Sequence, residues 1–229
     1  MLELSLVQKI SIWVVPVLLG ITVHEVMHGF VARKLGDNTA FMLGRLTLNP
    51  LKHVDPVGTI LIPGLLVLLQ AGFLFGYAKP VPINWRNLRH PKRDMALVAA
   101  AGPISNLFMA IAWALLIRLG VLLGEPGMPL IYMGVAGITI NIILMVLNLL
   151  PLPPLGGGRV MTGLLPGPLA YKFSRIEPYG FFILIGLLVT GILGLVLWPV
   201  ISAVMSMVVP VSGLSAQKFQ ILLMTLMGG

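Results

Sequence analysis

The chain has 229 residues, of which 58% are hydrophobic and 10% are charged, and its formal net charge is +8. Soluble domains carry roughly 25% charged residues, so this composition excludes an ordinary soluble protein and indicates an integral membrane protein. Because the basic residues lie mainly in short segments between apolar stretches, they indicate membrane topology and contact with lipid headgroups, and they do not predict a nucleic-acid partner.

We expect an all-α membrane protein, a multi-pass helical bundle that forms a single membrane-embedded domain over residues 1–229. A helix that crosses the bilayer needs about 20 apolar residues, and four stretches reach this length. The first stretch lacks the features of a cleaved signal peptide, so we interpret it as a retained span. Residues 200–229 are interrupted by Pro210 and Gly213 and form a fifth span, an interfacial helix or both. The four predicted spans are 7–34, 95–119, 130–150 and 176–198.

The first predicted span contains the sequence His24-Glu25-Val26-Met27-His28, and residues 10–31 carry no other charged side chain. Positions i and i+4 lie on one face of a helix, so His24 and His28 can share one metal ion while Glu25 reaches a metal-bound water. The alternative is that both histidines only bond to neighbouring helices, but such groups are costly to bury in a membrane without a metal or a partner. The chain has no cysteine, so a transition metal must be held by His and carboxylate ligands. We therefore predict Zn²⁺ at His24 and His28, with Glu25 as the general base.

Residues 41–78 follow the first span and do not have a simple helical pattern. Residues 41–55 alternate apolar and polar side chains around Gly44, which predicts a short β-hairpin or one or two strands. Residues 56–78 are apolar, but Pro63, Gly64 and Gly72 interrupt them, and basic residues flank both ends. A single crossing would place equally basic loops on opposite sides of the membrane. We therefore expect a re-entrant helix with an extended return that packs beside a cavity.

The distribution of charge predicts the orientation of the bundle. The loop over residues 120–129 has one Glu and no Lys or Arg, which places it outside the cell. Arg159, Lys172 and Arg175 return the chain to the cytoplasmic side. We expect a multi-pass protein of the cell membrane, with its active site near the cytoplasmic side because the histidines lie in the second half of the first span.

The chain contains four distinctive motifs: HEVMH at 24–28, KHVDP at 52–56, AGPISN at 101–106 and NLLPLPPLGGGR at 148–159. These motifs resemble those of the site-2 protease family of intramembrane zinc metalloproteases, occur in the order of that family and cover most of residues 10–165. The resemblance implies a protease-like core over about residues 7–165, followed by C-terminal spans over about residues 170–229. It also implies cleavage of transmembrane protein or peptide substrates by metal-activated water, in contact with membrane lipids.

The chain departs from the pattern of this family at Gly156. In the family the last motif carries an Asp that is the third zinc ligand, and Gly156 stands at the aligned position. Three interpretations remain open: a substitution introduced into an active parent, a natural loss that leaves a client-binding protein, or a site completed by water and a neighbouring group. Of the other acidic residues, only Asp55, beside His53, is a plausible substitute. We prefer the simpler interpretation, in which Asp55 starts the helix at Pro56 and His53 supports the strand region or the substrate groove.

Two asparagines near these motifs have alternative roles. Asn106 follows Gly102-Pro103 on the second predicted span. It forms an interhelical hydrogen bond, as is usual in membrane bundles, or, as the resemblance implies, it has a catalytic role by orienting the substrate or stabilising the oxyanion. Asn148 caps the helix break before Pro151 or holds the glycine loop near the metal, and we favour the cap. Arg159 is interpreted as an interface anchor.

The predicted function is that of an intramembrane zinc metalloprotease scaffold, which the substitution at Gly156 can impair. A substrate helix would unwind and pair as an extended strand with residues 41–54. The alternative is a catalytically inactive family member that binds client transmembrane helices. A metal transporter is a weaker third possibility, because the polar groups cluster on one helix without a second intramembrane carboxylate.

Overall fold

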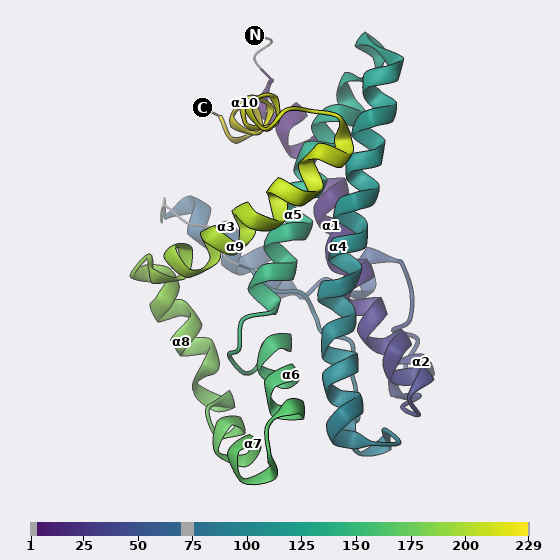
Figure 1. The fold of residues 1–229 in the computed structure, drawn as a ribbon, viewed down its shortest axis with the longest axis vertical. Helices are drawn as coiled ribbons and strands as arrows, with labels where there is room; N and C mark the ends of the chain where they lie inside the picture. Colours follow the sequence, from purple (N-terminus) through teal and green to yellow (C-terminus); the bar gives the residue numbers. More distant parts are fainter. Residues whose placement is uncertain (1–3, 70–75, 229) are drawn as a thin grey trace.

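Three long helices, α1 (Leu6–Lys34), α4 (Pro91–Leu123) and α5 (Met128–Asn148), form the centre of the computed structural model (Figure 1). The structure describes residues 4–69 and 76–228. Shorter helices surround this centre, and Figure 1 shows α6 and α7 at one end of the molecule and α10 at the other. The shorter helices are α2 (Thr39–Met42), η1 (Pro50–Lys52), η2 (Pro56–Leu61), α3 (Ile62–Leu68), η3 (Trp85–Asn87), η4 (Glu125–Gly127), α6 (Gly156–Leu164), α7 (Gly167–Ser174), α8 (Glu177–Val189), α9 (Ile192–Val208), η5 (Val209–Ser212) and α10 (Ala216–Met227).

Helix α1 begins at a capping box and ends in a turn with two basic residues. The Ser5 hydroxyl accepts a hydrogen bond from the backbone N–H of Gln8, and the Gln8 side chain accepts one from the backbone N–H of Ser5. This capping box satisfies two N–H groups that have no partner inside the helix. The last turn contains Arg33 and Lys34, whose positive charges interact favourably with the carboxyl end of the helix dipole.

Small residues bring α4 and α5 close together. A Cβ atom on Gly134 would lie 2.3 Å from the Ile117 side chain, and one on Gly137 would lie 2.3 Å from the Trp113 ring. Glycine at these two positions is therefore needed for the contact, as is common where membrane helices cross. Ile117, Val135 and Ile138 are completely buried in this interface. The tight packing fixes the position of α4 and α5 beside α1.

Among the residues that the structure describes, four helical segments are long and apolar enough to cross a membrane: Leu6–Lys34, Pro91–Leu123, Glu125–Asn148 and Ile192–Ser212. The first two contain the first two predicted spans, and the third contains the predicted span 130–150 except for its last two residues. The predicted span at 176–198 is wrong, because the chain breaks at Gly191, whose φ of +75° lies in the left-handed region that favours glycine. Helix α8 is consequently only 13 residues long, and the fourth candidate span is α9 with η5. Helix α10, with 12 residues, is too short to cross the bilayer.

The predicted β-hairpin over residues 41–55 is also wrong. No β-strand occurs within residues 4–69 and 76–228, and this segment consists of the end of α2, the short helix η1 and turns. Its alternating pattern reflects side-chain anchoring: Arg45 donates to the carbonyl oxygens of Lys79 and Pro80, and the Asn49 side chain accepts from the N–H of Leu51. Hydrogen bonds from side chains to the backbone thus take the place of the backbone hydrogen bonds between paired β-strands. The expected pairing of a substrate strand with residues 41–54 loses its structural basis.

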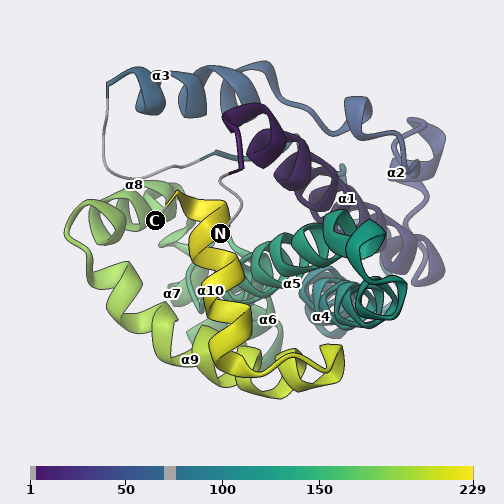
Figure 2. The ribbon, with the colours of Figure 1, turned by 90° about the horizontal axis from the view of Figure 1, so that it is seen from above.

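Residues 56–69 leave the bundle, and the chain returns to the place where they start. The Asp55 carboxylate accepts hydrogen bonds from the N–H groups of Val57 and Gly58, which confirms its predicted role as the start of this helix. The N–H of Tyr77 donates to the Gly58 carbonyl at 3.0 Å. In Figure 2, α3 lies beyond α1, on the side away from α4 and α5. The predicted break at Gly72 lies outside the described residues.

Asp37 ties the returning segment to the end of α1. Its carboxylate is completely buried and accepts hydrogen bonds from both the N–H and the hydroxyl of Thr39. It also accepts from the N–H of Asn84 at 2.8 Å and from the side-chain amide of Asn87 at 2.9 Å. One carboxylate therefore holds together the start of α2 and the chain around η3.

We expect Asp37→Asn to lower the free energy of unfolding by about 1–3 kcal/mol at neutral pH, because buried donors lose their acceptor. Burial opposes the charge, but the hydrogen bonds outweigh it and lower the pKa of Asp37 from its ordinary value of 3.8. A lowered pKa stabilises the fold above that value, and the contribution is lost as the pH falls through the folded-state pKa. The free energy of unfolding in detergent, measured at pH 7 and at a pH well below the ordinary value of 3.8, tests the effect. Exposed Glu125→Gln is the control, and an equal loss at both pH values would contradict the assignment.

Candidate metal centre

The two histidines of the HEVMH motif lie on one face of α1, as the i, i+4 spacing predicts. Their rings meet edge to face with centroids 4.7 Å apart, and the Nε2 atoms of His24 and His28 are 3.1 Å apart. His24 is buried, whereas Glu25 and His28 are half-buried. The pair lies in the second half of a helix that can span a membrane.

Each imidazole forms a hydrogen bond through its Nδ1 atom, on the side of the ring opposite Nε2. His24 Nδ1 lies 2.5 Å from Asn106 Oδ1, and His28 Nδ1 lies 2.7 Å from the Val98 carbonyl oxygen. A carbonyl oxygen can only accept a hydrogen bond, so Nδ1 of His28 carries the proton and its Nε2 has a free lone pair. Both Nε2 atoms point away from these partners and toward each other.

The donor set and the space around it fit part of a zinc site. Two nitrogens bound at about 2.0–2.1 Å to one tetrahedral zinc ion lie about 3.3–3.4 Å apart, close to the observed 3.1 Å. Gly102 of α4 faces both imidazoles, and a Cβ atom there would lie 2.4 Å from His28 Nε2 and 2.6 Å from His24 Nε2. The missing side chain of Gly102 leaves the space beside both nitrogen atoms open.

A third protein ligand of the usual kind is missing. In the part of the chain that the structure describes, no group of three His, Cys, Asp or Glu side chains could hold a metal ion. The plausible substitutes are engaged elsewhere: His53 Nε2 bonds to the Thr47 carbonyl, and Asp55 caps η2. Gly156 is the first residue of α6 and is buried.

Asn148 connects Gly156 to the histidine pair. The N–H of Gly156 donates to Asn148 Oδ1 at 2.6 Å, and Asn148 Nδ2 lies 2.5 Å from His24 Nε2. Asn148 therefore holds the glycine loop next to the imidazoles, which was the less favoured of its two predicted roles. The Asn148 side chain is therefore the link between Gly156 and the two imidazoles.

Asn106 lies behind His24, on the Nδ1 side of the ring. It also donates to Asn141 Oδ1 at 2.8 Å and to the Gly20 carbonyl at 3.3 Å. The structure thus places Asn106 in an interhelical hydrogen-bond network that supports a ring. This position behind the ring does not favour the predicted role of Asn106 in orienting the substrate or stabilising the oxyanion.

Glu25 is held by a backbone group that the sequence did not reveal. Its Oε2 atom accepts a hydrogen bond of 2.8 Å from the N–H of Val81, on the returning segment. Gly29 makes this approach possible, because a Cβ atom there would lie 2.8 Å from Val81 Cγ1 and 2.7 Å from Leu46 Cδ2. A glycine directly after the HEVMH motif is the one signal in the sequence that another segment passes close to the helix.

Arg159, predicted as an interface anchor, connects three elements. Its guanidinium carbon lies 4.9 Å from the centre of the Trp85 ring. One of its nitrogens lies 3.8 Å from the Glu177 carboxylate. The side chain thereby links α6 to η3 and α8.

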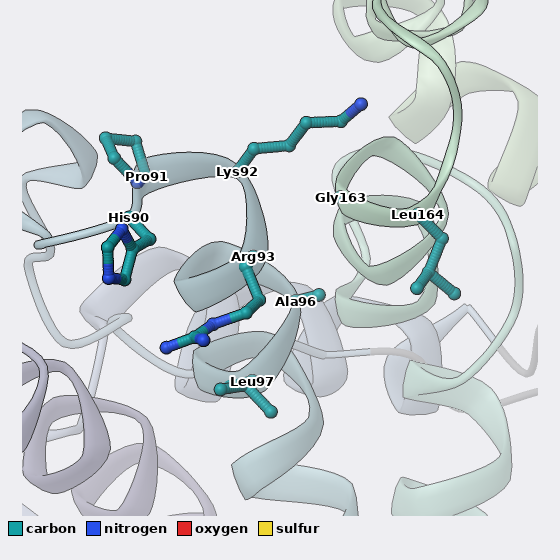
Figure 3. Close-up of a pocket in the computed structure, with 8 residues that line it drawn as sticks. All are labelled: His90, Pro91, Lys92, Arg93, Ala96, Leu97, Gly163 and Leu164. Carbon is teal, nitrogen blue, oxygen red and sulfur yellow. The ribbon is translucent and has the colours of Figure 1, made fainter.

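A separate pocket of about 510 Å³ lies where α4 begins and α6 ends. Figure 3 shows Lys92 and Arg93 pointing in different directions, with Leu97 and Leu164 on its apolar walls. None of the predicted catalytic or metal-binding residues lines it, so it is not the metal centre. The lining residues are His90, Pro91, Lys92, Arg93, Ala96, Leu97, Gly163 and Leu164.

Comparison with known proteins gives three informative relatives. The chain is 41% identical to "Putative zinc metalloprotease YwhC" of Bacillus subtilis over 198 residues, which cover 83% of the chain and 85% of the relative. It is 30% identical to "Putative zinc metalloprotease Rip2" of Mycolicibacterium smegmatis, over 76% of the chain and 64% of the relative. It is 31% identical to "Putative zinc metalloprotease MJ0611" of Methanocaldococcus jannaschii, over 62% of the chain and 64% of the relative. No family model and no solved structure matches the chain significantly.

Proposed function

The chain belongs to the zinc metalloprotease family represented by YwhC, and from this premise we propose an intramembrane protease of the site-2 type that cleaves transmembrane segments of membrane-protein substrates. One observation carries the proposal. His24 Nε2 and His28 Nε2 converge to 3.1 Å on a candidate membrane span, with Glu25 on the adjacent position of the same helix. Histidine and glutamate are costly inside a membrane and usually mark a functional site there.

His24 and His28 are the residues that would hold the zinc ion. When bound, zinc polarises a carbonyl group and lowers the pKa of a coordinated water. Glu25 takes the proton of the water that attacks the scissile carbonyl and delivers it to the leaving amine nitrogen. The N–H of Val81 fixes one oxygen of the Glu25 carboxylate, so the base is already oriented before a substrate arrives.

A substrate helix has to unwind before it can react. In a helix the scissile carbonyl accepts an intrahelical hydrogen bond and is shielded by neighbouring turns. The half-buried positions of Glu25 and His28 give an unwound segment access to these two residues. Substrates are therefore expected to carry residues of low helix propensity near the cleaved bond.

The proposed orientation places the active site near the cytoplasmic side of the cell membrane. In Figure 1 the end of α1, the start of α4 and helix α7 lie at one end of the molecule, and the loop between α4 and α5 lies at the other. The first group carries many basic residues, whereas η4 in the loop carries Glu125 and no basic residue. Cytoplasmic loops are generally the more basic ones, which supports this orientation.

A second candidate function is a non-catalytic membrane protein that binds client helices on the same scaffold. It is favoured by Gly156, which provides no carboxylate, and by the Asn148 amide that lies against His24 Nε2. This candidate shares the fold and the histidine pair but requires neither zinc nor Glu25.

Zinc binding by the purified protein in detergent micelles tests the proposed function. We expect about one zinc ion per chain at saturating zinc, weakly held because only two imidazoles bind it, and complete removal by a chelator. His28→Ala should abolish binding, and His90→Ala, at the start of α4 in the separate pocket, should leave it unchanged. Cleavage of single-span peptides should be lost with the zinc. Binding that survives His28→Ala in a folded protein would contradict the proposal.

A further inference from the structure

We infer that Asn141 of α5 is a positioning residue for the metal centre. Acting through Asn106 of α4, it fixes which ring nitrogen of His24 carries the proton. The consequence for zinc rests on the proposed function, whereas the position of the proton follows from the hydrogen bonds alone. Figure 1 shows the three helices α1, α4 and α5 together at the centre of the molecule.

The first step is the orientation of Asn141, whose side chain is completely buried. Its Nδ2 atom donates to the Gly137 carbonyl, one turn earlier on α5, at 2.9 Å. A carbonyl oxygen offers no hydrogen, so the nitrogen of this amide has to face Gly137. The oxygen of the Asn141 amide therefore faces Asn106.

The second step transfers this orientation to Asn106, which is also completely buried. Its Nδ2 atom donates to Asn141 Oδ1 at 2.8 Å and to the Gly20 carbonyl at 3.3 Å. Both partners can only accept, so the nitrogen of Asn106 has to face them. Its Oδ1 atom consequently faces His24 Nδ1 at 2.5 Å.

The third step assigns the proton of His24. Asn106 Oδ1 can only accept, so Nδ1 of His24 donates, and Nε2 keeps the lone pair that a metal needs. The other side of the ring independently gives the same answer. The N–H of Gly156 occupies Asn148 Oδ1, so the Asn148 amide nitrogen faces His24 Nε2 and donates to it.

Asn141 is needed because Asn106 has a second possible orientation. If the Asn106 amide were reversed, its oxygen would face two other oxygens, those of Asn141 and Gly20, and its nitrogen would face His24 Nδ1. The proton of His24 would then lie on Nε2, which cannot bind a metal in that form. Without Asn141, the only remaining acceptor that orients the Asn106 amide is the Gly20 carbonyl, at 3.3 Å, and the Asn148 amide on the other side of the ring is left to hold the ring form of His24. His28 needs no such support, because the backbone carbonyl of Val98 fixes its proton.

Three variants test the role of Asn141. Asn141→Leu keeps a similar volume and removes the acceptor, whereas Asn141→Asp keeps an oxygen facing Asn106. Thr139→Val is the matched control on the same helix, because the Thr139 hydroxyl is buried and bonds to the Val135 carbonyl of α5. The first measurement is ¹⁵N NMR of histidine-labelled, zinc-free protein in micelles, which reports the protonated ring nitrogen. The second is zinc affinity by competition with a chelator.

We expect Nδ1-protonated His24 in the unsubstituted protein, in Asn141→Asp and in Thr139→Val, and a mixture of the two forms in Asn141→Leu. Zinc affinity should fall about 10–100-fold in Asn141→Leu, as for other residues that orient a metal ligand, and stay near its starting value in Asn141→Asp. A folded Asn141→Leu protein with the original ring form and affinity would overturn the inference. An Asn141→Asp protein with the mixed ring forms and lowered affinity expected of Asn141→Leu would also overturn it.

If Asn141→Leu does not fold, the ¹⁵N spectrum of the unsubstituted protein still tests the inference. A proton on Nε2 of His24 would contradict it, because that form is incompatible with the hydrogen bonds from Asn141 through Asn106 to His24. The NMR measurement needs no zinc, so it separates this inference from the proposed function. Correct protonation without zinc binding would count against the metalloprotease function alone.

Discussion

Replacing Gly156 with Asp should convert a weak site with two imidazoles into a zinc site with three protein ligands. We expect zinc affinity to rise at least about 100-fold, the upper end of the effects that outer-shell residues have on metal binding. The reason is the position of residue 156, where a Cβ atom would lie 2.8 Å from Asn148 Oδ1. The amide nitrogen of the same Asn148 lies 2.5 Å from His24 Nε2. A carboxylate at 156 therefore has one movable side chain between it and the two imidazoles.

The new side chain also has to find room. Its Cβ atom would lie 3.1 Å from the Ala99 carbonyl, so the main displacement must come from the Asn148 amide at the end of its side chain. Gly156→Ala is the matched control, because it adds the same Cβ atom without a ligand. Zinc affinity by chelator competition and cleavage of single-span peptides measure the outcome. Equal zinc affinities for the Ala and Asp variants would contradict the assignment of position 156 to the metal shell.

The outcome also separates the three interpretations of Gly156. If Gly156→Asp gains zinc and cleavage, the remaining scaffold is competent, and the loss of the carboxylate alone explains any weakness of the present chain. If the chain already cleaves peptides at a comparable rate, water and a neighbouring group complete its site. If neither the present chain nor the folded Asp variant binds zinc or cleaves peptides, the protease proposal fails and the helix-binding interpretation is favoured.

Local patterns predicted the parts of the fold that local geometry controls. The spacing of His24 and His28 places them on one helix face, and the first three predicted spans correspond to helices long enough to span a membrane. The fourth predicted span failed at Gly191, because hydropathy does not detect one residue with a positive φ. The predicted hairpin failed because Arg45 and Asn49 bond through their side chains, so the alternating pattern was real but its cause was not strand pairing.

The parts of the site that sequence did not predict depend on how separate helices align. Asn141 is a polar residue within the third predicted span, and its role appears only when α4 brings Asn106 between it and His24. Val81 is an apolar residue whose contribution is its backbone N–H, and no side-chain pattern reports that. Gly102 precedes Pro103 on the second predicted span, and nothing in that pattern shows that its missing Cβ leaves space beside both imidazoles.

Glu25→Gln is expected to separate catalysis from binding. Glutamine is nearly the same size, and its amide oxygen can still accept the hydrogen bond from the N–H of Val81, so the fold and the zinc site should be preserved. It cannot take a proton from water, so cleavage should fall by about 10²–10⁴-fold, the usual contribution of a general base. The rate of peptide cleavage is measured in the present chain and in the Gly156→Asp background, with zinc content determined for each sample.

Glu125→Gln is the control, because it removes an exposed carboxylate in the loop between α4 and α5 and leaves Glu25 intact. Binding of a labelled single-span peptide is measured alongside cleavage. A protease requires that Glu25→Gln retains peptide binding and loses cleavage, since only the proton transfer is removed. Retained cleavage would exclude Glu25 as the base. If no variant cleaves while all bind the peptide equally, Glu25 has no catalytic role, and the membrane-embedded histidine pair is an inherited feature of a helix-binding protein.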